Sequence, residues 1–149
     1  MYKYFTLAEF FRTSTGIDNY PYSIEIRNNI HRLIEFMDIL REEWTVYCEN
    51  NNLGTGAIIV TSGYRNFEVN RKVKGSAKSA HLNGNAVDFK PANGFTIQFQ
   101  EFVLDFLKNK DYDQYMLEDI VNGRATWLHL GLFSNDGKQR KQNLFLSKI

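Results

Sequence analysis

QYMLEDIVNGRATWLHLGLF, residues 114–133, predicts a β-hairpin with strands Gln114–Val121 and Arg124–Phe133. Asn122 and Gly123 form the turn between the strands, because both central positions of a two-residue hairpin turn need positive φ and these residue types tolerate it. Apolar and polar residues alternate in the second strand, which is typical of a strand with one buried face. The hairpin therefore supplies two strands of a small sheet.

The two faces of this hairpin differ in chemistry. Alternation puts the leucines of the second strand on one face, toward a core, and His129 on the other face with Trp127 and Gly131. With a two-residue turn, Met116 pairs with His129 and Glu118 pairs with Trp127, so that Glu118 lies diagonally beside His129. We therefore expect a histidine and a carboxylate together on the open face.

The remaining segments complete an α+β fold. Apolar residues recur at helical spacing over residues 26–44 and 96–108, which predicts two amphipathic helices. Shorter helical turns are expected over residues 7–12, with Thr6 as N-cap, and over residues 66–72, and further strands over residues 57–61 and 86–90. We expect one domain over residues 1–149, with a small antiparallel sheet of four strands and both long helices packed on one face.

Composition narrows the classes of function. The chain has 149 residues, of which 43% are apolar, and its 18 basic and 17 acidic residues give a net charge of +1. With so small a net charge, the chain as a whole has no strong positive electrostatic field that would attract nucleic acid or an anionic membrane. Cys48 is the only cysteine, so a disulfide framework and cysteine-rich zinc patterns are excluded, and a metal has to be held by histidines and carboxylates.

The sequence carries no signal for export or membrane insertion. No apolar run approaches the roughly 20 residues of a membrane span, and Met1–Phe5 does not begin a signal peptide. We expect a monomer that is cytoplasmic as made.

SAHLNGNAVD, residues 79–88, puts His81 in a glycine-bearing turn and Asp88 on the following strand, pointing away from the core. Catalytic zinc takes three N or O ligands and leaves a fourth position for water. His81, Asp88 and His129 supply that count. Each histidine has an ordinary alternative: His81 as a hydrogen-bonded turn histidine, and His129 as a satisfied histidine on a sheet face.

Motif order connects these residues to a known family. The block Ser62-Gly63-Tyr64-Arg65, Asn70, Gly75-Ser76, Ser79, His81, Gly84, Ala86 and Asp88, followed by Trp127-Leu128-His129, resembles the zinc D-alanyl-D-alanine carboxypeptidases and L-alanyl-D-glutamate peptidases, which include phage endolysins. The resemblance extends to residues 5–10, 41–42, 113–114 and 140–142. It implies a hedgehog/DD-peptidase-like fold, one zinc ion held by His81, Asp88 and His129, and hydrolysis of a peptide bond in peptidoglycan peptide.

The resemblance also implies roles around the metal. Arg65 would hold the substrate or the developing oxyanion with its planar guanidinium, and a surface salt bridge is the alternative. Ser79 is either a substrate contact or a turn cap. Tyr64 and Trp127 either line the pocket or pack in the core. The basic segment 71–78 either attracts substrate carboxylates or is a solvated loop.

One position departs from the family pattern. Many members carry the catalytic Glu or Asp three residues before the last histidine, where this chain has Thr126, and threonine cannot act as a general base. Glu118 is the substitute candidate, because the hairpin register brings it to the face of His129, whereas Asp119 faces the other way. The alternative for Glu118 is a solvent-facing strand carboxylate.

Three functions stay open at this point. The first is a zinc peptidase that acts on the peptidoglycan stem peptide. The second is a non-catalytic zinc-containing module that binds cell wall or belongs to a phage particle, and Thr126 is its best support. The third is a plain interaction domain in which the histidines are coincidental, and the complete ligand set argues against it.

Overall fold

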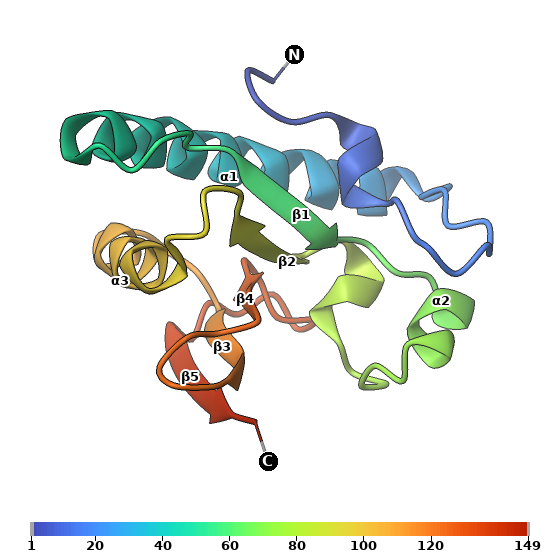
Figure 1. The fold of residues 1–149 in the computed structure, drawn as a ribbon. Helices are drawn as coiled ribbons and strands as arrows, with labels where there is room; N and C mark the ends of the chain where they lie inside the picture. Colours follow the sequence, from blue (N-terminus) through green and yellow to red (C-terminus); the bar gives the residue numbers. More distant parts are fainter. Residues whose placement is uncertain (1, 149) are drawn as a thin grey trace.

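The computed structural model describes residues 2–148 and confirms the α+β class (Figure 1). Its elements, in chain order, are η1 (Leu7–Phe10), α1 (Ile24–Asn51), β1 (Ile58–Ser62), α2 (Phe67–Lys72), η2 (Ala80–Asn83), β2 (Ala86–Pro91), α3 (Thr96–Leu107), β3 (Gln114–Ile120), β4 (Trp127–Gly131) and β5 (Gln142–Ser147). No helix within residues 2–148 has the length and apolar content needed to cross a membrane.

The five strands form one sheet in the order β1-β2-β4-β3-β5. The four predicted strands pair antiparallel, as expected. Strand β5 is not predicted from the sequence; it pairs parallel to β3 and makes one edge of the sheet mixed. The reason is physical: a parallel partner is fixed by contacts far along the chain and leaves little local pattern.

The hairpin between β3 and β4 has the predicted register. Met116 is paired with His129 and Glu118 with Trp127. The turn residues Asn122 and Gly123 both have positive φ, at 53° and 78°. Glu118 and His129 therefore share the face of the sheet that the core does not use.

Helices α1 and α3 pack on the other face. Trp44 of α1 lies 4.9 Å from Phe99 of α3 between ring centroids, and Phe99 lies 5.8 Å from Phe89 of β2. All three rings are fully buried, and burying a side chain of this size contributes about 1.5–3 kcal/mol. The predicted placement of both helices on one side is confirmed, and the opposite face of the sheet is left for a site.

Helix α1 is longer than its apolar pattern predicts. It begins after Ser23, whose hydroxyl accepts a hydrogen bond from the backbone N–H of Ile26 as an N-cap. It ends at Asn51, and the C-cap residue Asn52 has a left-handed backbone conformation with φ 55°. Most residues of the last turns are exposed, so the helical spacing of apolar residues is weak there. Cys48 nevertheless lies on the same buried side of the helix as the earlier apolar residues.

Candidate metal centre

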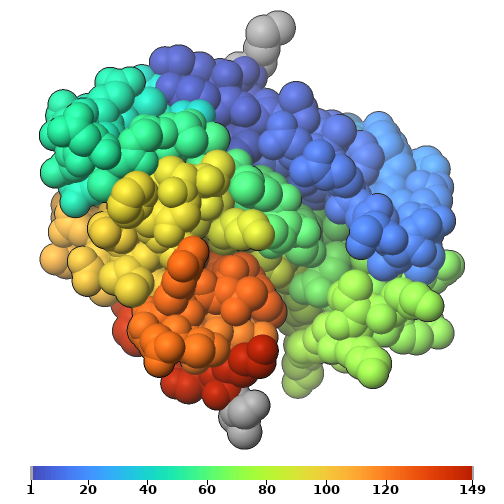
Figure 2. All heavy atoms as spheres, viewed as in Figure 1, coloured from blue at the N-terminus to red at the C-terminus, as the bar shows by residue number. Residues whose placement is uncertain are grey.

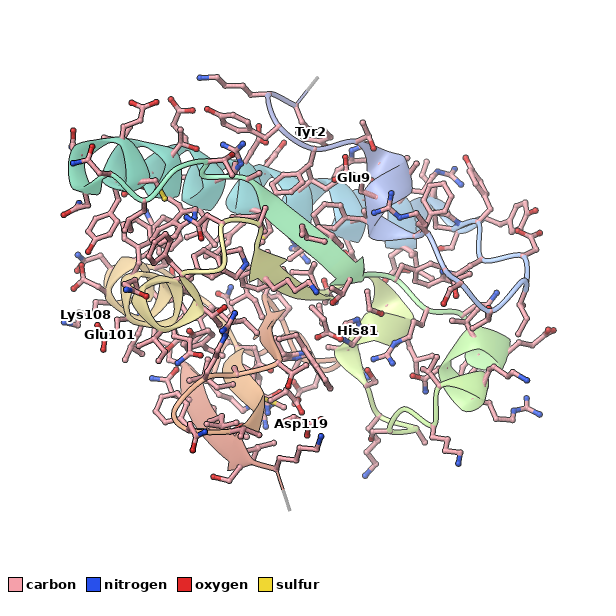
Figure 3. The ribbon with its side chains drawn as sticks, in the orientation of Figure 1. Tyr2, Glu9, His81, Glu101, Lys108 and Asp119 are labelled. Atoms are coloured by element: carbon pink, nitrogen blue, oxygen red, sulfur yellow. The ribbon has the colours of Figure 1, made fainter. Side chains whose placement is uncertain are left out.

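His81 is held in place by the backbone around it. Ser79 caps η2, and its hydroxyl accepts a hydrogen bond from the His81 N–H at 3.2 Å. The Nδ1 atom of His81 lies 2.7 Å from the carbonyl oxygen of Gly63. Because a carbonyl can only accept, the proton sits on Nδ1 and the lone pair of Nε2 faces the site. In Figure 3 His81 lies on η2, next to the strands of the sheet.

Asp88 and His129 reach the same point from two paired strands. They are direct partners in the β2–β4 register, and His129 Nδ1 lies 2.9 Å from Asp88 Oδ1. His81 Nε2 lies 3.3 Å from the same oxygen. One ligand atom from each of the three side chains lies within 4.8 Å of the others. The structure thus brings together all three predicted ligands, which come from η2, β2 and β4.

Burial and charge set the protonation state of this group. Desolvation lowers the pKa of His81, which favours the neutral imidazole. Desolvation also opposes ionisation of Asp88, but the two histidines outweigh it and hold the pKa of that carboxyl well below its usual range. A neutral imidazole beside a carboxylate is the state that binds a divalent metal without first releasing protons.

The donor set fits zinc. Two imidazole nitrogens and one carboxylate oxygen are the ligands found in catalytic zinc sites, and they leave one position open. The Gly63 carbonyl that orients His81 is the outer partner that metal-bound histidines usually have. The buried group can therefore hold one metal ion.

The three side chains open into a cleft of about 560 Å³. Figure 2 shows a notch between the light-green segment around residues 70–80 and the orange and red C-terminal strands, and residues from both sides line the cleft. Of the predicted site residues, Arg65, Ser79, Glu118 and Trp127 line it together with the ligands. A cleft of this size is in the range of ligand sites.

Glu118 is the one cleft carboxylate without a structural partner among the described residues. Of the three that line the cleft, Asp88 is bound to the histidines, and Asp113 accepts from Arg140 Nε at 2.8 Å and from its terminal nitrogen at 2.9 Å. Burial raises the pKa of Glu118, His129 lowers it, and the nearby Asp88 raises it further. Such a carboxyl is suited to exchanging a proton.

Arg65 carries an uncompensated charge. Within residues 2–148 no carboxylate lies within 4.0 Å of its guanidinium, and its Nε is buried without a hydrogen-bond partner. Burial lowers the pKa of Arg65, while Asp88 raises it. The predicted alternative of a surface salt bridge does not occur in the described chain, and the group is available to an anionic ligand.

The other residues considered for the site fall into two groups, those that line the cleft and those that lie outside it. Trp127 lines the cleft, and Ser79 lines it while also serving as the turn cap. Tyr64 is 8% exposed, belongs to the hydrophobic core and is not among the residues that line the cleft. The structure therefore gives no support to a substrate contact by Tyr64. Thr126 is exposed outside the cleft, where its hydroxyl donates to the Asp119 carbonyl at 3.1 Å.

Two features of the site had no assigned role in the sequence. One is the Gly63 carbonyl, which orients His81. The other is the ion pair of Asp113 and Arg140, which forms part of the cleft wall. The segments containing Asp113 and Arg140 belong to the family resemblance, and that signal could have paired them.

Comparison with known proteins agrees with the geometry. Residues 3–130 match the sequence profile of the family described as Peptidase M15, whereas no curated protein matches the chain. The matched range runs from before η1 to the penultimate residue of β4, so it includes His81, Asp88 and His129 and ends before β5. The resemblance stated from the motifs is confirmed. The chain belongs to the Peptidase M15 family.

Proposed function

We propose that this chain is a zinc-dependent peptidase that cleaves a peptide bond in the stem peptide of peptidoglycan. The observation that carries the proposal is the buried group of His81, Asp88 and His129, open to a cleft that also presents an unpaired Glu118 and an unpaired Arg65. Membership of a peptidase family supports hydrolysis as the reaction.

The chemistry divides among the side chains. His81, Asp88 and His129 would hold a zinc ion, which would supply a Lewis acid and make water acidic enough to give up a proton near neutral pH. Glu118 accepts the proton of the attacking water and returns it to the leaving amine. Its raised pKa brings it nearer to neutral pH, which favours both transfers. Arg65 donates hydrogen bonds to the carbonyl oxygen as it gains charge, or to a substrate carboxylate.

Charge in the cleft supports an acidic peptide as substrate. Lys74 and Lys78 line the cleft on the side of Arg65, and both are exposed. Neither lysine has a carboxylate within 4.0 Å in the described chain. Stem peptides carry several free carboxylates, which such a wall would attract. The proposal of peptidoglycan itself rests on the motif resemblance.

A second candidate is a non-catalytic module that keeps the metal site to bind cell-wall peptide. Thr126 favours it, because the position that is acidic in many relatives holds a hydroxyl turned away from the cleft. The two candidates predict the same metal content and differ in turnover. The experiment that separates them therefore has to measure both.

The test is digestion of purified peptidoglycan with the zinc-loaded protein, with and without a chelator, followed by mass analysis of the fragments. A peptidase releases defined peptide fragments, and the chelator or His81→Ala abolishes the release. One bound zinc per chain without any release would reject the peptidase and support the binding module. Release that persists in His81→Ala would reject the metal site as its cause.

A further inference from the structure

A second cavity adjoins the cleft at Asp88. It has a volume of about 530 Å³ and shares Arg65, Asp88 and Trp127 with the cleft. We call the cleft the first arm and this cavity the second arm. Since Asp88 lines both arms, the two arms meet at this carboxylate. A ligand bound there has room on both sides.

The second arm is built into the fold. Its other lining residues are Arg12, Thr13, Ser14, Thr61, Ser62, Val69 and Val73, from the segment after η1, the end of β1, and α2 with the residue after it. In Figure 1 the segment after η1 passes alongside the end of β1 and α2.

Asn19 fixes that segment to the Arg65 region. Its side-chain amide donates to the carbonyls of Phe11 and Tyr64, both at 2.7 Å, and its oxygen accepts from the Asn66 N–H at 2.8 Å. Asn19 is 5% exposed, so these bonds are shielded from water. The arm is therefore formed before any ligand arrives.

The chemistry of the second arm suits a peptide with a carboxylate. Four hydroxyl side chains line it, and hydroxyls donate to and accept from peptide groups. Arg12 is exposed and has no carboxylate within 4.0 Å in the described part of the chain. The only acidic side chain among the described residues that line this arm is Asp88, which lies 2.9 Å from His129 Nδ1.

We propose that the second arm is a substrate subsite, so that the peptide runs through both arms, Arg12 binds one of its carboxylates, and the bond that is cut is an internal one. This inference rests on the proposed function. A site that removes only a terminal residue should end near the cation that holds the terminal carboxylate. Arg65 instead lies where the two arms meet, and lined space continues beyond it.

The test uses a synthetic stem peptide whose amino end is acetylated and whose carboxyl end is amidated, together with versions shortened from each end. The parent, Arg12→Ala and Arg71→Ala are compared by kcat/KM. Arg71 is a matched control, because it is also an exposed arginine and lines neither arm. We expect cleavage of the blocked peptide, and a loss of about two- to fivefold in Arg12→Ala, the range of an exposed charge pair.

Shortening supplies the second criterion. A peptide that no longer reaches the second arm should be cut equally by the parent and Arg12→Ala, so the two losses do not add. The full peptide with a free carboxyl end is digested alongside the blocked one. Release of only the terminal residue from the free peptide with no cleavage of the blocked one, or equal rates for Arg12→Ala and Arg71→Ala on the full peptide, would overturn the inference while the peptidase stands. If neither the blocked nor the free peptide is hydrolysed, the proposed function fails. Calorimetric binding of the full peptide then decides the subsite, and equal affinities of parent and Arg12→Ala would reject it.

Discussion

Replacing Glu118 by glutamine tests the assignment of the general base. The substitution keeps the shape of the side chain and removes its ability to take a proton. General acid–base catalysis contributes about 10²- to 10⁴-fold to a rate, which corresponds to about 3–5.5 kcal/mol in the activation barrier. We expect kcat to fall by that factor. Zinc content should stay at one ion per chain, because Glu118 is not among the three side chains that can hold the metal.

The assay is hydrolysis of a stem peptide over a range of pH, with zinc measured on the same samples. The base has to be ionised, so kcat/KM of the parent should fall as the pH drops through the pKa of Glu118, which burial raises. The residual activity of Glu118→Gln should lack this acid limb. Asp119→Asn is the control, because Asp119 neighbours Glu118, has φ 50°, which asparagine also tolerates, and does not line the cleft.

Two results would contradict the role of Glu118 as the general base. The first is a Glu118→Gln variant that keeps its zinc and more than about a tenth of the parent kcat, since a base should contribute at least 10²-fold. The second is an equal loss in Asp119→Asn. A variant that loses its zinc would instead show that Glu118 supports the metal, which the geometry does not predict.

Three further predictions concern stability. Free zinc at 100 times its Kd should stabilise the fold by about 2.7 kcal/mol and raise Tm by about 5–10 °C, and a rise of equal size in His129→Ala would contradict the metal site. Gly63→Ala should lower the free energy of unfolding by about 1–3 kcal/mol, because the new Cβ would lie 2.3 Å from the Phe10 carbonyl oxygen; a parent-like Tm would reject this. Asp113→Asn should cost about 1–2 kcal/mol at pH 7, measured by urea unfolding. Burial opposes ionisation of the Asp113 carboxyl, but Arg140 outweighs this effect and lowers the pKa of Asp113 in the folded state. The cost should therefore be present above the unfolded-state pKa and be lost as the pH falls through the lower folded-state pKa; an equal cost at neutral and at low pH would argue against the ion pair.

The central sheet and its open face could be predicted because their determinants are local. Asn122 and Gly123 specify the turn, and the turn fixes the register that puts Glu118 on the face of His129. The metal ligands could not be predicted from local pattern, because the spacing of His81 and His129 is equally compatible with ordinary structural histidines. They could be predicted from the order of the whole motif, which resembles that of the peptidase family.

Other features depend on contacts that a local pattern does not contain. Strand β5 is positioned by long-range bonds, among them Gln142 N–H to the Asp113 carbonyl at 2.8 Å and Lys141 N–H to the Tyr112 carbonyl at 3.0 Å. The location of Tyr64 could not be predicted for the same reason. A tyrosine in a motif can line a pocket or pack in the core, and only the tertiary packing decides between the two.

The strand order also determines when the site can be completed. His81 and Asp88 are seven positions apart and can meet early, whereas His129 arrives only when β4 is inserted between β2 and β3. Distant pairings of this kind form late in folding. A chain that paired β2 with β3 directly would keep two ligands and lack the third. We therefore expect high-affinity zinc binding during refolding to follow insertion of β4. The fraction of chains with bound zinc would then measure the fraction in which β4 has paired with β2 and β3.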